Sequence, residues 1–152
     1  MWNDLEEYIL KLAIENSEKT GRKTKIVEIG AGKFQTISNN LSENENIEIL
    51  MTDIDPANEN VIKDDVFNPN INIYKDADIL FSIRPPAELQ EAIMKIRDEV
   101  DATLIIKPVF NEDLNIKTQK MKLKNYNRAS FYIYEKWKNK LINQQIILTK
   151  PS

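Results

Sequence analysis

The residues best suited to ligand chemistry are two glycines that directly follow an apolar run containing one acid. The run is Ile26-Val27-Glu28-Ile29, and Gly30 and Gly32 follow it with one residue between them. Glycine adopts positive φ angles and lets a ligand approach the backbone, because it has no Cβ. A strand that ends in such a turn and leads into a helix is typical of nucleotide and nucleoside sites. The pattern also fits a tight strand-to-helix turn that binds nothing.

A second strand ends in an acid at the spacing that such a site requires. Residues 47–52 form an apolar run, and Asp53 follows it. Asp53 lies 21 residues beyond Gly32. Nucleotide-binding βαβ units place the acid that binds ribose hydroxyls about 20 residues after the glycine turn. We therefore expect Asp53 to bind a ribose, the alternative being an exposed acid in a turn.

The composition excludes several classes of mechanism. The 152 residues include no histidine and no cysteine. Ser-His-Asp and Cys-His nucleophilic mechanisms are therefore excluded, and we expect no metal site, since zinc, copper and non-haem iron lose their preferred ligands. Acid–base chemistry would fall to carboxylates, lysine or tyrosine. The absence of cysteine suits a cytoplasmic location, and no apolar run approaches the ~20 residues of a membrane helix.

The elements that would position these residues alternate between strands and helices or short connections. Apolar residues at helical spacing predict a helix over 4–17, with Asn3 as its N-cap and Glu6 completing a capping box. Further helices are predicted over 34–41 and 87–100, and 112–119 is compatible with another. Predicted strands cover 26–29, 47–52, 60–63, 77–82, 102–106, 129–135 and 145–149. The pattern indicates one α/β domain over residues 1–152, with a mostly parallel, three-layer sheet and shortened crossovers.

The net charge of -3 conceals two segments of opposite sign. Acids dominate residues 43–78, and lysine and arginine dominate residues 117–140. This fits either two solvated faces or an acidic pocket for a cationic ligand beside a basic surface for an anionic partner. Five aromatic residues and five cations of the basic segment interleave: Tyr126, Phe131, Tyr132, Tyr134 and Trp137 with Lys122, Lys124, Arg128, Lys136 and Lys138. Such a mixture is compatible with RNA binding, although the alternation over 131–134 equally fits a half-buried strand.

The sequence from Glu28 to Gly32 resembles the first motif of class I S-adenosylmethionine-dependent methyltransferases, which is an acid, a spacer and Gly-x-Gly. A larger set of segments resembles an uncharacterised archaeal family of small Rossmann-like proteins. These segments are 28–32, 52–56, 64–67, 82–86 (Ser-Ile-Arg-Pro-Pro), Asn125-Tyr126 and Phe131-Tyr132. The resemblance spans nearly the whole chain and implies a Rossmann-like fold with S-adenosylmethionine as the expected ligand.

The resemblance also implies roles for individual residues. Gly30 and Gly32 would let the backbone approach the methionine part of the ligand, whose amino group Glu28 would hold directly or through water. Asp53 would accept hydrogen bonds from the ribose hydroxyls. Asp65 would accept one from the adenine amine, and Ser82 would line the methionine side.

The chain also departs from related patterns. Phe34 and Gln35 stand where the dinucleotide fingerprint has its third glycine, which disfavours a nicotinamide ligand. Arg84 precedes the two prolines and Ala87 follows them, unlike the motif of enzymes that methylate exocyclic base amines. We expect Arg84 to orient an anionic group of a substrate, such as a carboxylate or phosphate. Its alternative role is a surface salt bridge.

Three functions remain open from the sequence. One is a minimal methyltransferase, because transfer from a sulfonium depends mainly on positioning. Another is a non-catalytic nucleoside-binding or complex-forming module, because short crossovers would leave the pocket open to water. The last is RNA binding through the basic segment.

Overall fold

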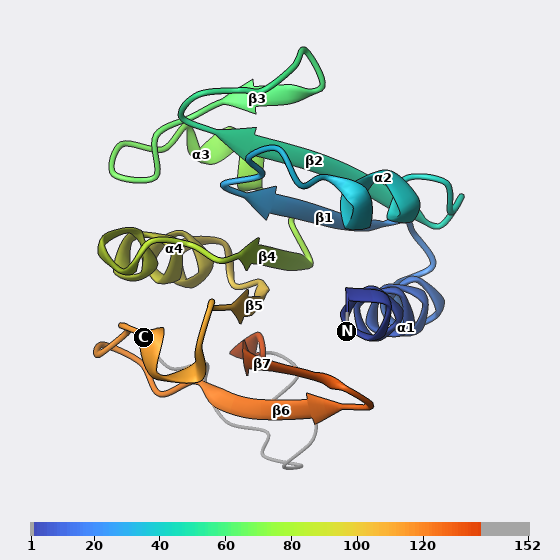
Figure 1. The fold of residues 1–152 in the computed structure, drawn as a ribbon. Helices are drawn as coiled ribbons and strands as arrows, with labels where there is room; N and C mark the ends of the chain where they lie inside the picture. Colours follow the sequence, from blue (N-terminus) through green and yellow to red (C-terminus); the bar gives the residue numbers. More distant parts are fainter. Residues whose placement is uncertain (1, 138–152) are drawn as a thin grey trace.

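The structure is a computed structural model that describes residues 2–137, and these residues form a seven-stranded sheet with helices on both faces (Figure 1). The strands lie in the order β3-β2-β1-β4-β5-β7-β6. Their bounds are β1 Thr24–Ile29, β2 Ile47–Asp53, β3 Val61–Lys63, β4 Ile79–Ile83, β5 Thr103–Lys107, β6 Lys122–Tyr126 and β7 Ala129–Tyr134. Strands β1 to β5 are parallel, and β7 and β6 add an antiparallel hairpin at one edge. The predicted α/β fold with a mostly parallel sheet is confirmed.

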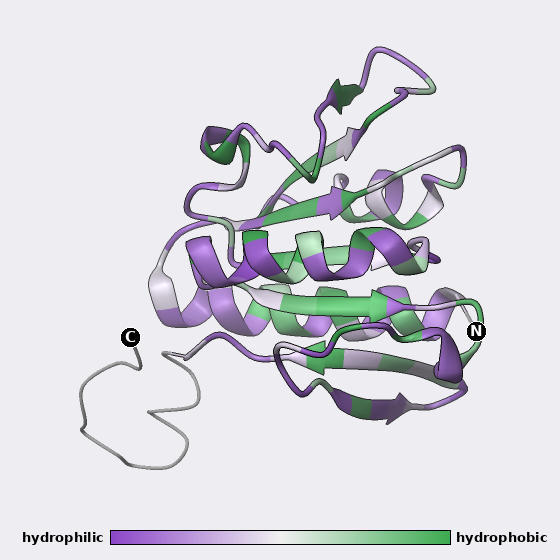
Figure 2. Ribbon diagram, turned by 90° about the vertical axis from the view of Figure 1, so that its left-hand side faces the viewer, coloured by the Kyte–Doolittle hydropathy of each residue, from purple (hydrophilic) through white to green (hydrophobic). Residues whose placement is uncertain are grey.

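Two layers of helices cover the sheet. Helices α1 (Trp2–Thr20) and α2 (Thr36–Leu41) pack on one face, and α3 (Ile71–Tyr74) and α4 (Ala87–Val100) pack on the other. A short 3-10 turn, η1 (Asn111–Asp113), follows β5. In Figure 2 the central strands are mostly green, the colour of hydrophobic residues, whereas the helices alternate between purple and green. This is the pattern of strands buried on both faces beneath amphipathic helices.

The alternation of side chains along β1 divides the core between the two faces. Ile26 packs with the α1 side chains, whereas Val27 and Ile29 pack with the α4 side chains. Successive residues of a strand point to opposite faces of a sheet. This period of two also decides which β1 side chains can face a ligand on the α4 side.

The connections around β3 are short, as the sequence predicts. Residues 54–60 join β2 to β3 without a helix, and the connection to β4 contains only the four residues of α3. Among the residues that the structure describes, no helix is both long and apolar enough to span a membrane.

Two sequence predictions about helices were wrong. Helix α1 begins at Trp2, so Asn3 lies inside the helix and does not cap it. The indole of Trp2 packs 5.1 Å from the Phe34 ring, which favours the extra residue of helix. Residues 112–119 are not a helix beyond η1, because their backbone instead hydrogen bonds to side chains of α4: the N–H of Asn115 donates to Gln90.

Strand β6 was not predicted, because its Lys122-to-Tyr126 sequence alternates weakly and carries two lysines. Lysines are common on edge strands, where they oppose pairing with another chain. The predicted strand at 145–149 lies outside the described residues.

Candidate functional site

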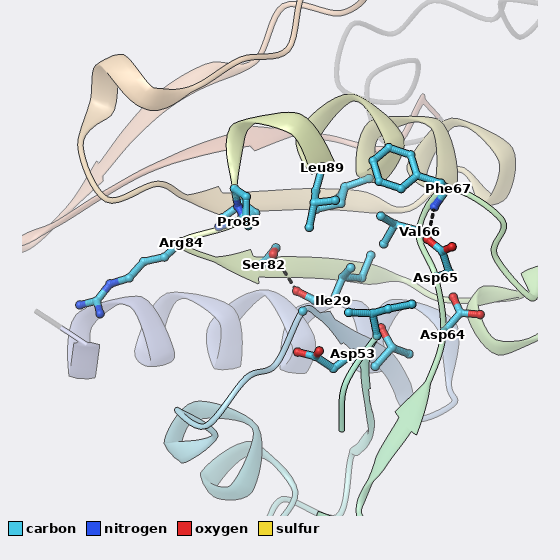
Figure 3. A pocket seen from close by; sticks show the side chains of 15 residues that line it. Ile29, Asp53, Asp64, Asp65, Val66, Phe67, Ser82, Arg84, Pro85 and Leu89 are labelled. Carbon is cyan, nitrogen blue, oxygen red and sulfur yellow. Dashed lines mark hydrogen bonds between the residues drawn. The ribbon is translucent and has the colours of Figure 1, made fainter. Parts of the chain in front are cut away.

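A cavity of about 510 Å³ opens at the carboxyl ends of β1, β2 and β4 (Figure 3). The chain runs from β1 outward to β2 and β3, and then returns to place β4 on the other side of β1. The direction of winding therefore reverses between β1 and β4. In open α/β sheets, ligands bind in the crevice at this switch point. Its position makes the cavity the candidate functional site.

The glycine turn leaves space above its backbone. Gly30 and Gly32 have φ angles of 71° and 58°, in the left-handed region that favours glycine. The N–H groups of Gly30 and Ala31 both donate to the carbonyl of Thr52, which joins the turn to β2. A Cβ on Gly30 would meet only the Ser82 hydroxyl oxygen, at 3.8 Å, and a Cβ on Gly32 would meet nothing within 4 Å. The turn therefore has room for a closely approaching ligand.

Asp53 lies at the cavity and holds the glycine turn. One of its carboxylate oxygens accepts the N–H of Gly32 at 2.8 Å, and the other accepts the N–H of Asp55 at 2.9 Å. A carboxylate oxygen has two lone pairs. Each oxygen of Asp53 can therefore accept a further hydrogen bond from a ligand hydroxyl.

Glu28 lies outside the lining of the cavity, on the α2 side of β1. Its side chain is buried, one carboxylate oxygen accepts the Ser38 hydroxyl at 2.6 Å, and Oε2 has no partner. Burial, with a smaller contribution from the charge of Asp53, raises the pKa of Glu28 to about 7, against the effect of the Ser38 hydrogen bond.

Gly32, like Glu28, is outside the lining of the cavity. Gly30, Asp53, Asp65, Ser82 and Arg84 are the predicted site residues that line the cavity.

The other polar residues of the cavity are held by local hydrogen bonds. The Ser82 hydroxyl donates to the carbonyl of Ile29 at 2.7 Å. Asp65 accepts the N–H of Phe67 at 2.9 Å, and the neighbouring Asp64 accepts the Tyr74 hydroxyl at 2.6 Å. Burial, followed by the hydrogen bond to Asp64, raises the pKa of Tyr74 far above its ordinary value. Three carboxylates (Asp53, Asp64 and Asp65) therefore line the cavity. Their negative charges would favour a cationic ligand.

Apolar residues that the sequence analysis did not select form the walls. Ile54, Val66, Phe67 and Leu89 line the cavity. Figure 3 shows the side chains of Val66, Phe67 and Leu89 around it. Ile54 is 58% exposed and Phe67 is 63% exposed. Ligand sites combine apolar walls with a few convergent polar groups. The available sequence signal was Ile54 directly after the strand-ending Asp53, and Phe67 two residues after Asp65.

Arg84 lines the mouth of the cavity with its side chain extended away from it (Figure 3). The residue has a φ of 55°, and its N–H donates to the carbonyl of Lys107 at 2.6 Å. The guanidinium lies 4.9 Å over the Trp2 ring. Among residues 2–137, no carboxylate forms an ion pair with Arg84.

The aromatic residues of the basic segment mainly serve packing. Phe131 and Tyr134 are buried, and Tyr126, Tyr132 and Trp137 are half-buried. The Tyr8 ring of α1 packs 5.2 Å from Tyr126 and 4.9 Å from Phe131. RNA binding by this segment stays a prediction, and Lys138 and Lys140 lie outside the described residues.

Solved structures share this fold. The bifunctional kinase-methyltransferase WbdD aligns with a TM-score of 0.61 at 10% identity, over 88% of this chain and 39% of WbdD. An S-adenosyl-L-methionine methyl transferase from Silicibacter pomeroyi aligns with a TM-score of 0.50 at 11% identity, over 87% of this chain and 95% of that protein. At such identities the likeness concerns the fold, and it confirms a methyltransferase-like Rossmann architecture.

Sequence relatives are archaeal proteins of similar length. A protein from Methanothermobacter thermautotrophicus is 40% identical over 134 residues, which are 88% of this chain and 95% of the relative. One from Methanocaldococcus jannaschii is 42% identical over 138 residues, which are 86% of this chain and 93% of the relative. Both are UPF0146 proteins. The profile of the uncharacterised protein family UPF0146 matches residues 4–136, and the chain therefore belongs to this archaeal family.

Proposed function

We propose that the cavity binds S-adenosylmethionine and that the protein is a minimal methyltransferase. The observation that carries this proposal is the hydrogen bond between Asp53 and the glycine turn at the switch point of the sheet. The acid lines the cavity while one oxygen accepts the N–H of Gly32, so a ribose-binding carboxylate and a ligand-accommodating turn form one unit. The solved methyltransferases support the proposal at the level of the fold.

The residues of the cavity suit the parts of such a ligand. Asp53 would accept hydrogen bonds from the ribose hydroxyls, and Asp65 one from the adenine amine. Ile54 and Phe67 would contact the faces of the adenine ring. Gly30 and Ser82 would lie along the methionine part. Glu28, beneath the turn and outside the lining, would act on the amino group through water.

The chain's contribution to the reaction would be positioning. When bound, the sulfonium group supplies an activated methyl group, so no histidine or cysteine is needed to create a leaving group. The walls made by Ile54, Phe67 and Leu89 would contact the ligand and orient it, and the acceptor would approach past Arg84 and Pro85 at the cavity mouth. Fixing two reactants in a productive orientation removes a large part of the entropic barrier.

The alternative is a nucleoside-binding module without catalysis, and one observation favours it. The helix-free connection 54–60 and the single turn of α3 leave the site less enclosed than full crossover helices would. The two functions separate in an assay with radiolabelled methyl donor and acceptor fractions of small molecules, RNA and protein. Label transfer that Asp53→Ala reduces supports the methyltransferase. Binding of the donor with no transfer to any fraction would contradict it and favour the module.

A further inference from the structure

We propose that Arg84 and Lys107 form a two-cation clamp that binds an oxyanion of the methyl acceptor, either a phosphate or a carboxylate group. The inference deepens the proposed function and rests on it, because it assigns the acceptor's chemical class beside the site proposed for the methyl donor. It adds Lys107, which no sequence motif indicated.

The fold joins the backbones of the two cationic residues. Arg84 directly follows β4 and Lys107 ends β5, in a register where Ile83 pairs with Lys107. The N–H of Arg84 donates to the carbonyl of Lys107 at 2.6 Å, which fixes the two backbones together. Lys107 is half-buried, so its ammonium has lost part of its contact with water.

Neither cation has a carboxylate partner within the described part of the chain. Elsewhere the buried Arg97 pairs with Asp98 and Asp101, and the largely buried Lys136 pairs with Asp78. Burial, followed by the positive charge of Arg84, lowers the pKa of Lys107. Two neighbouring like charges without counter-ions destabilise a fold. An oxyanion between them would remove that repulsion.

The conformation of Arg84 fits a ligand-binding role. Its φ of 55° lies in a region that L-residues other than asparagine and aspartate seldom occupy, and such strain is concentrated at functional sites. The guanidinium stacks over Trp2 at 4.9 Å, which orients its plane. A stacked guanidinium keeps the N–H groups at its edge available, and these match the paired oxygens of a phosphate or carboxylate.

A second cavity provides room for the rest of the acceptor. It measures about 640 Å³ and shares Arg84, Pro85 and Pro86 with the first cavity, so an acceptor there would lie next to the donor. Val109, 55% exposed, gives it an apolar contact. Glu112 and Asp113 also line it, and Asp113 accepts the N–H of Phe110 at 3.0 Å. We assign the oxyanion to the Arg84 side of this cavity.

The clamp predicts specific anion binding at low ionic strength. Inorganic phosphate and acetate would be titrated into wild type, Lys107→Gln and the control Lys23→Gln, which removes an exposed charge at the amino end of β1. We expect Lys107→Gln to weaken anion binding by at least about tenfold, since one charge-assisted hydrogen bond is lost. Lys23→Gln should bind as wild type does. Preference for phosphate assigns a phosphate-bearing acceptor, and equal or stronger acetate binding assigns a carboxylate.

A second readout separates the clamp from a structural role. NMR titration of the Lys107 side chain should show its pKa rising when the anion binds. Without the anion, Lys107→Gln should be as stable as wild type or more stable, because repulsion from Arg84 is relieved. A clear loss of stability, or equal anion binding by wild type and Lys107→Gln, would overturn the clamp. Anion binding by a wild-type protein that fails to bind S-adenosylmethionine would contradict the proposed function and leave the clamp standing.

Discussion

The carboxylate of Asp53 accepts the backbone N–H of Gly32 at 2.8 Å, across 21 residues of sequence. The acid that ends β2 therefore fixes the turn that ends β1. Since Gly30 also donates to the carbonyl of Thr52, the two strand ends form one hydrogen-bonded unit at the cavity. A change on either strand should consequently affect both the turn and the ligand site.

The two glycines form a matched pair of substitutions. Gly30→Ala and Gly32→Ala each place a Cβ at positive φ, which should cost about 1 kcal/mol of unfolding free energy. Gly30 lines the cavity beside Ser82, and Gly32 does not. We therefore expect Gly30→Ala to weaken ligand binding more than Gly32→Ala does, as measured by calorimetry, at similar stability by urea unfolding. Equal binding losses would show that the turn acts only through its conformation.

Glu28 should make the stability depend on pH. Its pKa is about 7 in the folded protein, and the ordinary value is 4.5, so the folded state holds a proton that the unfolded state has released between these values. Stability should therefore fall as pH rises from 4.5 to 7 and then level off. At about 1.4 kcal/mol per pKa unit, the penalty above pH 7 is at most roughly 3.5 kcal/mol.

Glu28→Gln tests this dependence, because the amide keeps an acceptor for Ser38 and removes the charge. The variant should match wild type near pH 5 and exceed its unfolding free energy at pH 8. Urea unfolding at both pH values measures the difference, and Glu48→Gln, on the exposed side of β2, is the control. A Glu28→Gln protein less stable than wild type at pH 8 would contradict the account.

Asp78 should make the stability fall as pH is lowered, whereas Glu28 makes it fall as pH rises. It is 3% exposed and joins Arg22, the N–H of Lys25 and Lys136. Burial alone would raise the pKa of Asp78, but the hydrogen bonds from Arg22 and Lys25 and the charge of Lys136 hold it below its ordinary value. The stability that this provides is present above about pH 4 and is lost as pH falls through the lowered pKa.

Asp78→Asn should therefore lower the unfolding free energy by about 1–3 kcal/mol at pH 7, since it leaves the N–H of Lys25 and the cations Arg22 and Lys136 without their charged partner. The difference from wild type should shrink on acidification, as followed by thermal melts from pH 7 to pH 3. Asp76→Asn, two residues earlier and exposed, should change little. A difference that is constant over this range would rule out the charge as the cause.

The fold could be predicted from sequence where apolar periodicity was strong. The strands around Ile26 and Leu104 are buried on both faces, and their apolar runs, of which the first is interrupted only by Glu28, identify them. Strand β6 could not be predicted because an edge strand needs little apolar sequence. The segment after Glu112 was ambiguous, since its extended course depends on side chains of α4 that only the folded chain brings near it.

The sequence predicted the part of the candidate site that comes from the glycine turn and the acid at fixed spacing from it. Spacing alone suggested that Gly30 and Asp53 belong together, and the structure places them at one cavity. Glu28 shows the limit of such reasoning, because a strand points alternate side chains to opposite faces and Ile29 therefore takes the cavity side. The walls formed by Ile54 and Phe67 and the neighbouring cations Arg84 and Lys107 depend on three-dimensional placement.

Binding of S-adenosylmethionine in the cavity should depend on Asp53. Isothermal titration calorimetry with S-adenosylmethionine and S-adenosylhomocysteine would compare wild type, Asp53→Ala and Asp55→Ala, after urea unfolding has shown that each variant is folded. Asp55 is an exposed acid two residues further along and serves as the matched control. We predict saturable binding to wild type and Asp55→Ala, and binding to Asp53→Ala weakened by at least about tenfold, the effect of losing hydrogen bonds to a charged acceptor. Folded wild-type protein that binds neither compound would contradict the account.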